Sequence, residues 1–320
     1  MSEEDSIERK KIEEIVGKLA IQPQDLSHFE LQEIIFNDSF SKIYKVVDKQ
    51  TNLCYCARIL IIDYGNISDS AYFDLFNQLS IIQEIKFPSI VNFICYSLKD
   101  FKNKDRLTII EDFCPNNTLD YLLENIEKGV SNLQLTDTQK LILIYGVASA
   151  FSYLHSLDII HRDLKPANIF LDENLFPKVG DFALAIKQSN LEFENSVIKG
   201  TPVYMAPEAM QYDYTKKVDV YAFSMVVYQI MTGKSRLYDN SFNYFRLIMD
   251  VQKGVRPVFD KEIPKCYTKL IEDCWSGDPD QRPNFDSIVS LLENDKNFIT
   301  ENVNEIEFRR YVDYIKQHGH

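Results

Sequence analysis

The residues of this chain best suited to chemistry stand close together between positions 161 and 182. His161 to Asn168 reads His-Arg-Asp-Leu-Lys-Pro-Ala-Asn, so a carboxylate, Asp163, precedes a cation, Lys165, and an amide. A second carboxylate follows at Asp181, in Gly-Asp-Phe. Phosphoryl transfer needs a carboxylate to orient the attacking hydroxyl, a cation for the moving phosphoryl group, and oxygen ligands for magnesium. The pattern therefore indicates phosphoryl-transfer chemistry.

This block resembles the catalytic loop and the metal-binding motif of eukaryotic protein kinases. Gly-Thr-Pro-Val-Tyr-Met-Ala-Pro-Glu at 200–208 extends the resemblance. Asp219 matches the helix aspartate that braces the catalytic loop in the family, and Arg282 matches the arginine that pairs with the Ala-Pro-Glu glutamate, here Glu208. Together these motifs are specific, and they cover the chain from about Phe29 to Leu292.

The resemblance is to the serine/threonine or tyrosine-kinase-like type, with an altered small lobe. It implies an α+β, two-lobed protein kinase fold, in which a small five-stranded antiparallel sheet plus one helix sits above a larger, mainly helical lobe. The domain boundaries that we predict are a charged N-terminal extension at 1–28, a kinase domain at 29–294 and a charged tail at 295–320. Within the domain, the small lobe takes 29–112 and the large lobe 113–294.

Residue periodicity predicts the elements that must position these groups. Alternating apolar residues predict strands at 29–36, 42–48, 53–62, 91–98 and 106–112. Apolar residues at helical spacing predict helices at 70–86 and 137–156, the second begun by a capping box of Thr136 and Gln139. A short charged helix is expected within 1–20. An amphipathic helix is expected at 305–316, as a solvated or capping helix, with a partner-docking segment as the alternative.

The resemblance implies a role for each matching residue. Asp163, Lys165 and Asn168 would be catalytic, and Asn168 and Asp181 would hold Mg²⁺. Lys165 favours serine/threonine specificity. The residues expected to contact ATP are Ile35, Ile43, Cys56, Arg58, Asp112, Cys114 and Phe170.

The segment from Asp181 to Glu208 would be the activation segment. Arg162 would anchor it when it is phosphorylated. Ser196 is the preferred regulatory site, ahead of Ser189 and Thr201, because the family's threonine at the last position supports the substrate site.

The small lobe departs from the family pattern at the phosphate-binding loop. The three glycine positions of the family fall on Phe36, Asp38 and Ser41. Glycine lets backbone N–H groups approach phosphates closely. The loop is therefore expected to hold ATP less well.

A second group of departures concerns charge. Arg58 replaces the lysine that holds the α- and β-phosphates, and Gln78 replaces its glutamate partner on the following helix. Ala183 replaces the Asp-Phe-Gly glycine, and Glu111 stands where the family has an apolar residue or threonine. Alternation points Arg58 and Glu111 inward from their strands. We therefore expect a salt bridge between them, near Gln78; the alternative is an exposed Glu111 with Arg58 free to reach ATP.

Two main functions remain open at this point, and a nucleotide-binding sensor without phosphate transfer lies between them. The intact large-lobe groups favour a signalling enzyme that transfers the ATP γ-phosphate to Ser/Thr hydroxyls with weak activity. The altered small lobe favours a catalytically inactive pseudokinase that acts as a scaffold or allosteric partner.

Composition and charge limit the binding partners and the cell compartment that we expect for this chain. A net charge of −13 over 320 residues argues against nonspecific binding to nucleic acid or anionic membranes. No run of about 18 apolar residues occurs, so no membrane span is expected. Six scattered cysteines indicate reduced thiols and a cytoplasmic location. The expected partner is a protein substrate or signalling protein, and the sequence leaves the oligomeric state open.

Overall fold

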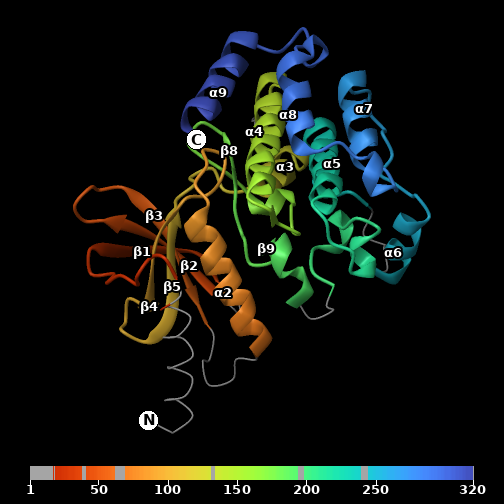
Figure 1. Ribbon diagram of the computed structural model, residues 1–320. Coiled ribbons are helices and arrows are strands. Elements are labelled where there is room, and N and C mark those ends of the chain that lie inside the picture. Colours follow the sequence, from red (N-terminus) through yellow and green to blue (C-terminus); the bar gives the residue numbers. More distant parts are fainter. Residues whose placement is uncertain are drawn as a thin grey trace. The chain divides into compact units, whose positions relative to one another are not determined.

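A computed structural model describes residues 17, 19–37, 41–61, 69–130, 134–193, 198–238 and 244–319. The chain divides into two compact units (Figure 1). Unit 1 comprises Met1–Lys86 and Val91–Cys114, and unit 2 comprises Phe87–Ile90 and Pro115–His320. Residues 87–90 thus belong to unit 2, although the segments on both sides of them belong to unit 1. From Pro115 onward the chain belongs to unit 2 alone.

Unit 1 contains an antiparallel sheet with the strand order β1-β2-β3-β5-β4. Its elements are β1 (Phe29–Asn37), β2 (Ser41–Asp48), β3 (Cys54–Leu60), α2 (Asp69–Glu84), β4 (Phe93–Lys99) and β5 (Asp105–Asp112). Every one of them begins and ends within two residues of the predicted range. The five-stranded antiparallel sheet with one helix is therefore confirmed.

One hydrophobic cluster of unit 1 lies on one face of this sheet. It is made by Phe29, Val46, Ala57, Cys95 and Ile110, one from each strand, together with Leu26 from the segment before β1. That segment is also tied to β4, because the Gln24 N–H donates to the Tyr96 carbonyl and the Tyr96 hydroxyl donates to the Ile21 carbonyl. The charged helix predicted within 1–20 lies almost entirely outside the described residues.

Unit 2 is mainly helical. Its α-helices are α3 (Leu119–Glu127), α4 (Asp137–Ser156), α5 (Lys217–Thr232), α6 (Tyr244–Gln252), α7 (Lys265–Cys274), α8 (Phe285–Asn294) and α9 (Glu305–His318). Its short strands are β6 (Ile159–Ile160), β7 (Ile169–Leu171), β8 (Pro177–Val179) and β9 (Ile186–Lys187). Strand β6 pairs with β9, and β7 pairs with β8.

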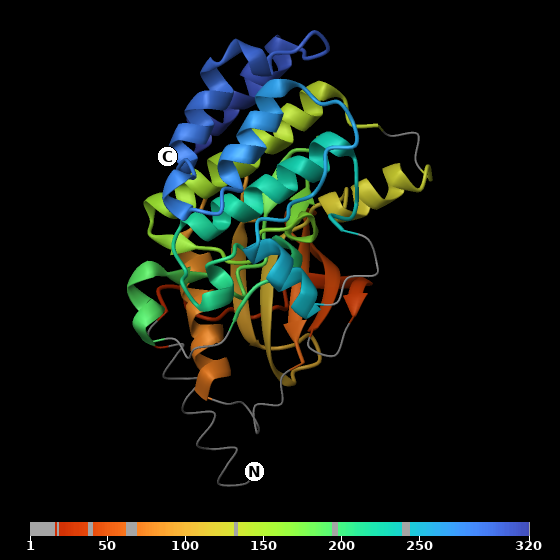
Figure 2. The same ribbon diagram turned by 90° about the vertical axis from the view of Figure 1, so that its right-hand side faces the viewer.

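Helix α4 forms the centre of unit 2 and contacts α5, α8 and α9 (Figures 1 and 2). Its predicted bounds and capping box are both confirmed, since Thr136 and Gln139 each bond the backbone N–H of the other. Every residue from Leu141 to Phe151 is buried. Helix α5 is likewise buried from Val218 to Thr232 and ends at Gly233, whose φ of +70° suits glycine. Two buried helices thus give the short catalytic segments a rigid support.

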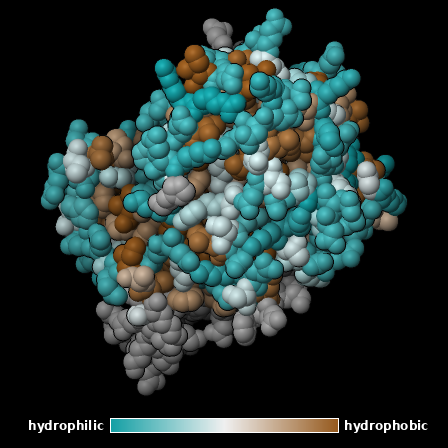
Figure 3. All heavy atoms as spheres, turned by 45° about the horizontal axis from the view of Figure 1, so that its top comes forward, coloured by the Kyte–Doolittle hydropathy of each residue, from teal (hydrophilic) through white to brown (hydrophobic). Residues whose placement is uncertain are grey.

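On the face drawn in Figure 3, hydrophilic side chains predominate and hydrophobic ones occur in small dispersed groups. In the described part of the chain, no helix is both long enough and apolar enough to cross a bilayer.

Candidate active site

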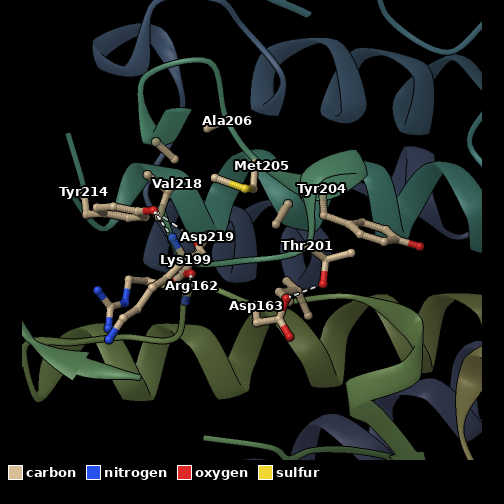
Figure 4. A pocket seen from close by; sticks show the side chains of 13 residues that line it. Arg162, Asp163, Lys199, Thr201, Tyr204, Met205, Ala206, Tyr214, Val218 and Asp219 are labelled. Atoms are coloured by element: carbon tan, nitrogen blue, oxygen red, sulfur yellow. Dashed lines mark hydrogen bonds between the residues drawn. The ribbon is translucent and has the colours of Figure 1, made fainter. Parts of the chain in front are cut away.

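Asp163 lies at the centre of a hydrogen-bonded group in unit 2, within the loop between β6 and β7. The Lys165 ammonium donates to its Oδ2 at 2.7 Å, and the Asn168 side-chain amide donates to the same oxygen at 3.1 Å. The Thr201 hydroxyl donates to Oδ1 at 2.6 Å (Figure 4). Lys165 also donates to the Thr201 oxygen, at 2.8 Å. The three residues predicted to be catalytic are therefore brought together, and both carboxylate oxygens of Asp163 are held in place.

The loop keeps its shape because Asp219, buried in α5, accepts hydrogen bonds from its backbone. The N–H groups of His161 and Arg162 donate to the Asp219 carboxylate at 3.0 and 2.9 Å. Arg162 has a φ of +66°, which is unfavourable for a residue with a side chain. The two bonds stabilise this conformation, so Asp219 does brace the loop.

Asp219 also has a third partner, His155, which the sequence does not predict. His155, at the end of α4, lies with Nε2 2.9 Å from the Asp219 carboxylate. Only the folded arrangement of α4 against α5 places the two side chains together.

Asn168 and Asp181 are the residues expected to hold a cation. The Asn168 side-chain nitrogen is committed to Asp163, where it donates to the backbone carbonyl at 2.8 Å as well as to the carboxylate. These two bonds use the amide nitrogen, and the amide oxygen is the kind of ligand that Mg²⁺ takes. The backbone bond from Gly180 N–H to the Asn168 carbonyl, 2.9 Å, ties the two segments together one residue before Asp181. An amide oxygen and a carboxylate form a donor set that suits Mg²⁺.

His161 and Phe182 pack against each other beneath this site. Their ring centroids lie 5.0 Å apart, and Phe151 of α4 lies 5.6 Å from the His161 ring. His161 Nε2 lies 3.1 Å from the Gly180 carbonyl oxygen. His161 is thus a core residue whose ring nitrogen has a hydrogen-bond partner. Ala183, next to Phe182, is exposed.

The predicted pair of Arg282 and Glu208 is present and bidentate. The two guanidinium nitrogens Nη1 and Nη2 lie 2.5 and 2.9 Å from the two carboxylate oxygens. Arg282 is 1% exposed, and its guanidinium lies 5.2 Å from the centre of the Tyr221 ring. The pair fixes the end of the segment that carries Thr201. Of the predicted phosphorylation sites, Ser189 is exposed, and Ser196 lies outside the described residues.

A small cavity lies next to Asp163, between this segment and α5 (Figure 4). Arg162, Tyr204, Met205 and Tyr214 are among its lining residues. Its volume of about 10 Å³ holds roughly one water molecule, which is too small for a substrate.

In unit 1, the predicted ion pair of Arg58 and Glu111 is confirmed. Arg58 Nη2 donates to Glu111 Oε1 at 3.0 Å, and the side chains are 14% and 18% exposed. Gln78 lies on α2 and is buried. The cation on β3 is therefore bound by a carboxylate from β5 of the same sheet. Burial raises the pKa of the neighbouring Cys56 thiol to about 12, with a further contribution from Glu111 that Arg58 partly offsets.

The residues expected to contact ATP are divided between the two units. Phe170 lies in β7 of unit 2, and the other six belong to unit 1. Ile35 is 46% exposed on β1, and Ile43 is paired with Arg58 across β2 and β3. Asp112 ends β5, where its N–H donates to the Asn92 carbonyl, and Cys114 is half-buried two residues on.

The family pattern has glycine at the positions of Phe36, Asp38 and Ser41. Phe36 and Ser41 are within the described residues, and Asp38 is not. Phe36 is 51% exposed. Lys45 is a further cation on β2. Its Nζ lies 3.5 Å from Glu33 Oε1 and over the Phe113 ring, so its ammonium group already has an ion-pair partner and an aromatic contact.

Comparison with known proteins agrees with this geometry. The family model described as protein kinase domain matches residues 29–292, and the chain belongs to the protein kinase family. Dual specificity protein kinase shkA of Dictyostelium discoideum is 31% identical over 282 residues, which are 85% of this chain and 50% of that protein. Dual specificity protein kinase shkC of the same organism is 28% identical over 88% of this chain and 53% of that protein.

A protein of Acanthamoeba polyphaga mimivirus that carries the name of a serine/threonine-protein kinase/receptor is 31% identical over 71% of this chain, but over only 13% of its own length. The chain therefore spans about half or less of the length of these relatives. Members of the kinase family use ATP and Mg²⁺ in general, and they act on proteins.

Proposed function

We propose that this kinase-family signalling protein transfers the γ-phosphate of ATP to serine and threonine hydroxyls of other proteins, at a low rate. The arrangement around Asp163 carries the proposal, because Lys165, Asn168 and Thr201 all bond to its carboxylate. A carboxylate that is already fixed needs little reorganisation when a substrate hydroxyl arrives.

Each residue has a role that follows from its chemistry. Asp163 would orient the substrate hydroxyl and accept its proton as the oxygen bonds to the γ-phosphorus and ADP leaves. Lys165 would stabilise the negative charge on the phosphoryl group. Asn168 and Asp181 would hold Mg²⁺, which neutralises phosphate charge when it is bound.

The low rate follows from unit 1. Arg58 donates to Glu111, so part of its hydrogen-bonding capacity is already used before a phosphate binds. Phe36 and Ser41 also replace glycines of the family pattern. Loss of one preorganised charge contact typically lowers a rate by roughly 100- to 1000-fold.

The second candidate is a pseudokinase that acts as a scaffold or allosteric partner. The ion pair of Arg58 and Glu111 favours it, since a paired arginine is a poorer ligand for phosphate. The two candidates differ in a single measurable property, the transfer of phosphate that depends on Asp163.

Transfer of radiolabelled phosphate from ATP to a generic protein substrate separates them. We expect weak labelling by the wild type and none by Asp163→Asn. Asp273→Asn is the matched control, since Asp273 lies exposed on α7, and it should label like the wild type. Absence of labelling by the wild type, at an enzyme concentration where ATP with Mg²⁺ still raises the melting temperature, would favour the pseudokinase.

We also propose that the protein works in the cytoplasm. All six cysteines are free thiols, which the reducing cytosol maintains.

A further inference from the structure

The C-terminal helix α9 lies beyond the residues matched by the kinase family, which end at 292, yet it is firmly seated in unit 2. Four of its side chains are buried at helical spacing: Phe308, Tyr311, Val312 and Ile315. Their exposed fractions run from 0 to 4%. Such burial over one face is typical of an integral helix.

The seat of α9 is shaped around Tyr311. The Tyr311 ring lies 4.5 Å from the Phe176 ring and 6.2 Å from the Tyr145 ring, measured between centroids. Gly146 of α4 forms one wall, and a Cβ at this position would overlap both the Tyr311 hydroxyl and the Pro177 ring. Glycine is thus the residue that leaves room for the tyrosine.

Polar contacts complete the seat. The Glu293 carboxylate, at the end of α8, accepts from the Tyr145 hydroxyl at 2.6 Å and from the Lys316 ammonium at 2.7 Å. Arg309 donates to the Glu293 backbone carbonyl at 2.6 Å. Side chains of α9 therefore bind to both the side chain and the backbone of one residue.

The helix also contacts residues 87–90, the short stretch of unit 2 between α2 and β4. The Tyr311 hydroxyl lies 3.1 Å from the Ser89 hydroxyl, and Ser89 is fully buried. Gly319, just after α9, lies so close to the Phe87 ring that a Cβ there would overlap it. The Ser89 carbonyl in turn accepts from the Val179 N–H at 2.8 Å. Both ends of the connection are thus covered by α9 and the residue that follows it.

We propose that α9 is an intramolecular clamp on residues 87–90, with the Tyr311 hydroxyl as its link to Ser89. Helix α2 ends at Glu84, three positions before Phe87, and β4 begins at Phe93, three positions after Ile90. Because residues 87–90 join α2 to β4, docking of α9 against them limits the motion of this connection. The clamp is independent of whether the protein transfers phosphate.

Amide hydrogen exchange on the 320-residue chain tests the clamp. Tyr311→Ala removes the ring from the seat, and Ile306→Ala, on the exposed side of the same helix, is the matched control. The Ile90 N–H, which donates to the Phe87 carbonyl, reports on the connection. We expect Tyr311→Ala to speed exchange at this amide by at least about tenfold, because loss of the buried contact with Tyr311 lets residues 87–90 open locally. The control should leave that amide unchanged. Faster exchange confined to 305–319 would overturn the proposal, because α9 would then be a passive cover.

Tyr311→Phe and Ser89→Ala supply a second test, which holds even if Tyr311→Ala does not fold. Each removes one hydroxyl of the same bond, and each should speed exchange at Ile90 by about fivefold. If the bond is the link, the double variant should exchange no faster than either single variant. Multiplicative effects of the two substitutions would show that the hydroxyls act separately and would overturn the proposed link.

Discussion

At the scale of single residues, the arrangement around Asp163 shows how a short loop is made rigid. Its carboxylate is held by side chains from the loop itself and from Thr201, while its backbone neighbours are held by Asp219. The positive φ of Arg162 persists because these bonds outweigh its cost. Chemistry at this site should therefore be sensitive to single changes.

Substitution of the two carboxylates is the direct test of that sensitivity. Asp163→Asn removes the proton acceptor, and Asp181→Asn removes a charged magnesium ligand. Each should lower phosphate transfer by at least about 100-fold in a radiolabelling assay. Equal labelling by the wild type and both variants would mean that other groups, or a contaminant, transfer the phosphate.

The ion pair of unit 1 gives a prediction about stability. Arg58→Met leaves Glu111 half-buried without this partner, and the free energy of unfolding should fall by about 3 kcal/mol. The double variant Arg58→Met with Glu111→Met should recover much of that loss, since no charge is left behind. Urea unfolding of the wild type and the variants measures both effects.

The exposed pair of Lys99 and Asp105 on the same sheet serves as its control. Lys99→Met should change the free energy of unfolding by less than about 1 kcal/mol. An Arg58→Met variant as stable as the wild type would show that the pair of Arg58 and Glu111 adds nothing.

The thiols of β3 should differ in reactivity. Because burial raises the pKa of Cys56 to about 12, this residue stays protonated at neutral pH, and only the thiolate is a good nucleophile. Cys54, two residues away, is exposed. Mass spectrometry after brief treatment with iodoacetamide at pH 8 should find Cys54 modified well before Cys56, and the opposite order would contradict the burial of Cys56.

At the scale of elements, capping and periodicity within a helix or strand predict where that element begins and ends and which way its side chains point. The bounds of α4 follow from its capping box and its apolar spacing, and the pair of Arg58 and Glu111 follows from alternation along two neighbouring strands. The amphipathic helix expected at 305–316 is present as α9, but the residues against which its apolar face packs do not follow in this way. Six of its fourteen residues are charged, and its seat is built by Gly146, Phe176 and Ser89, which are far away in the chain. The bond between His155 and Asp219 escapes sequence reasoning for the same reason.

The capping box can be tested on its own. Thr136→Ala removes the side-chain acceptor for the Gln139 N–H at the start of α4. We expect a loss of about 1 kcal/mol in the free energy of unfolding, measured with urea. Thr136→Ser keeps the acceptor and should be close to the wild type. A similar loss in both variants would mean that packing of the threonine methyl group is what matters.

At the scale of the whole molecule, the chain combines a unit with intact catalytic groups and a unit with altered phosphate-binding positions. The bidentate pair of Arg282 and Glu208 and the buried helices α4 and α5 belong to unit 2. A protein of this construction can retain the kinase fold while its activity varies, because the groups that hold the large unit together are separate from those that have changed. Fold and activity are in this sense independent properties of the chain.

The bond between Ser89 and Tyr311 joins residues that are 222 positions apart. During synthesis, residues 87–90 are made 222 positions before Tyr311 at the Ser89–Tyr311 bond, so they remain without this cover until α9 has also been made. Closing so long a loop is slow compared with forming local helices. The apolar seat for α9 is therefore exposed on the nascent chain, and it is the surface on which a chaperone would act or premature aggregation would begin.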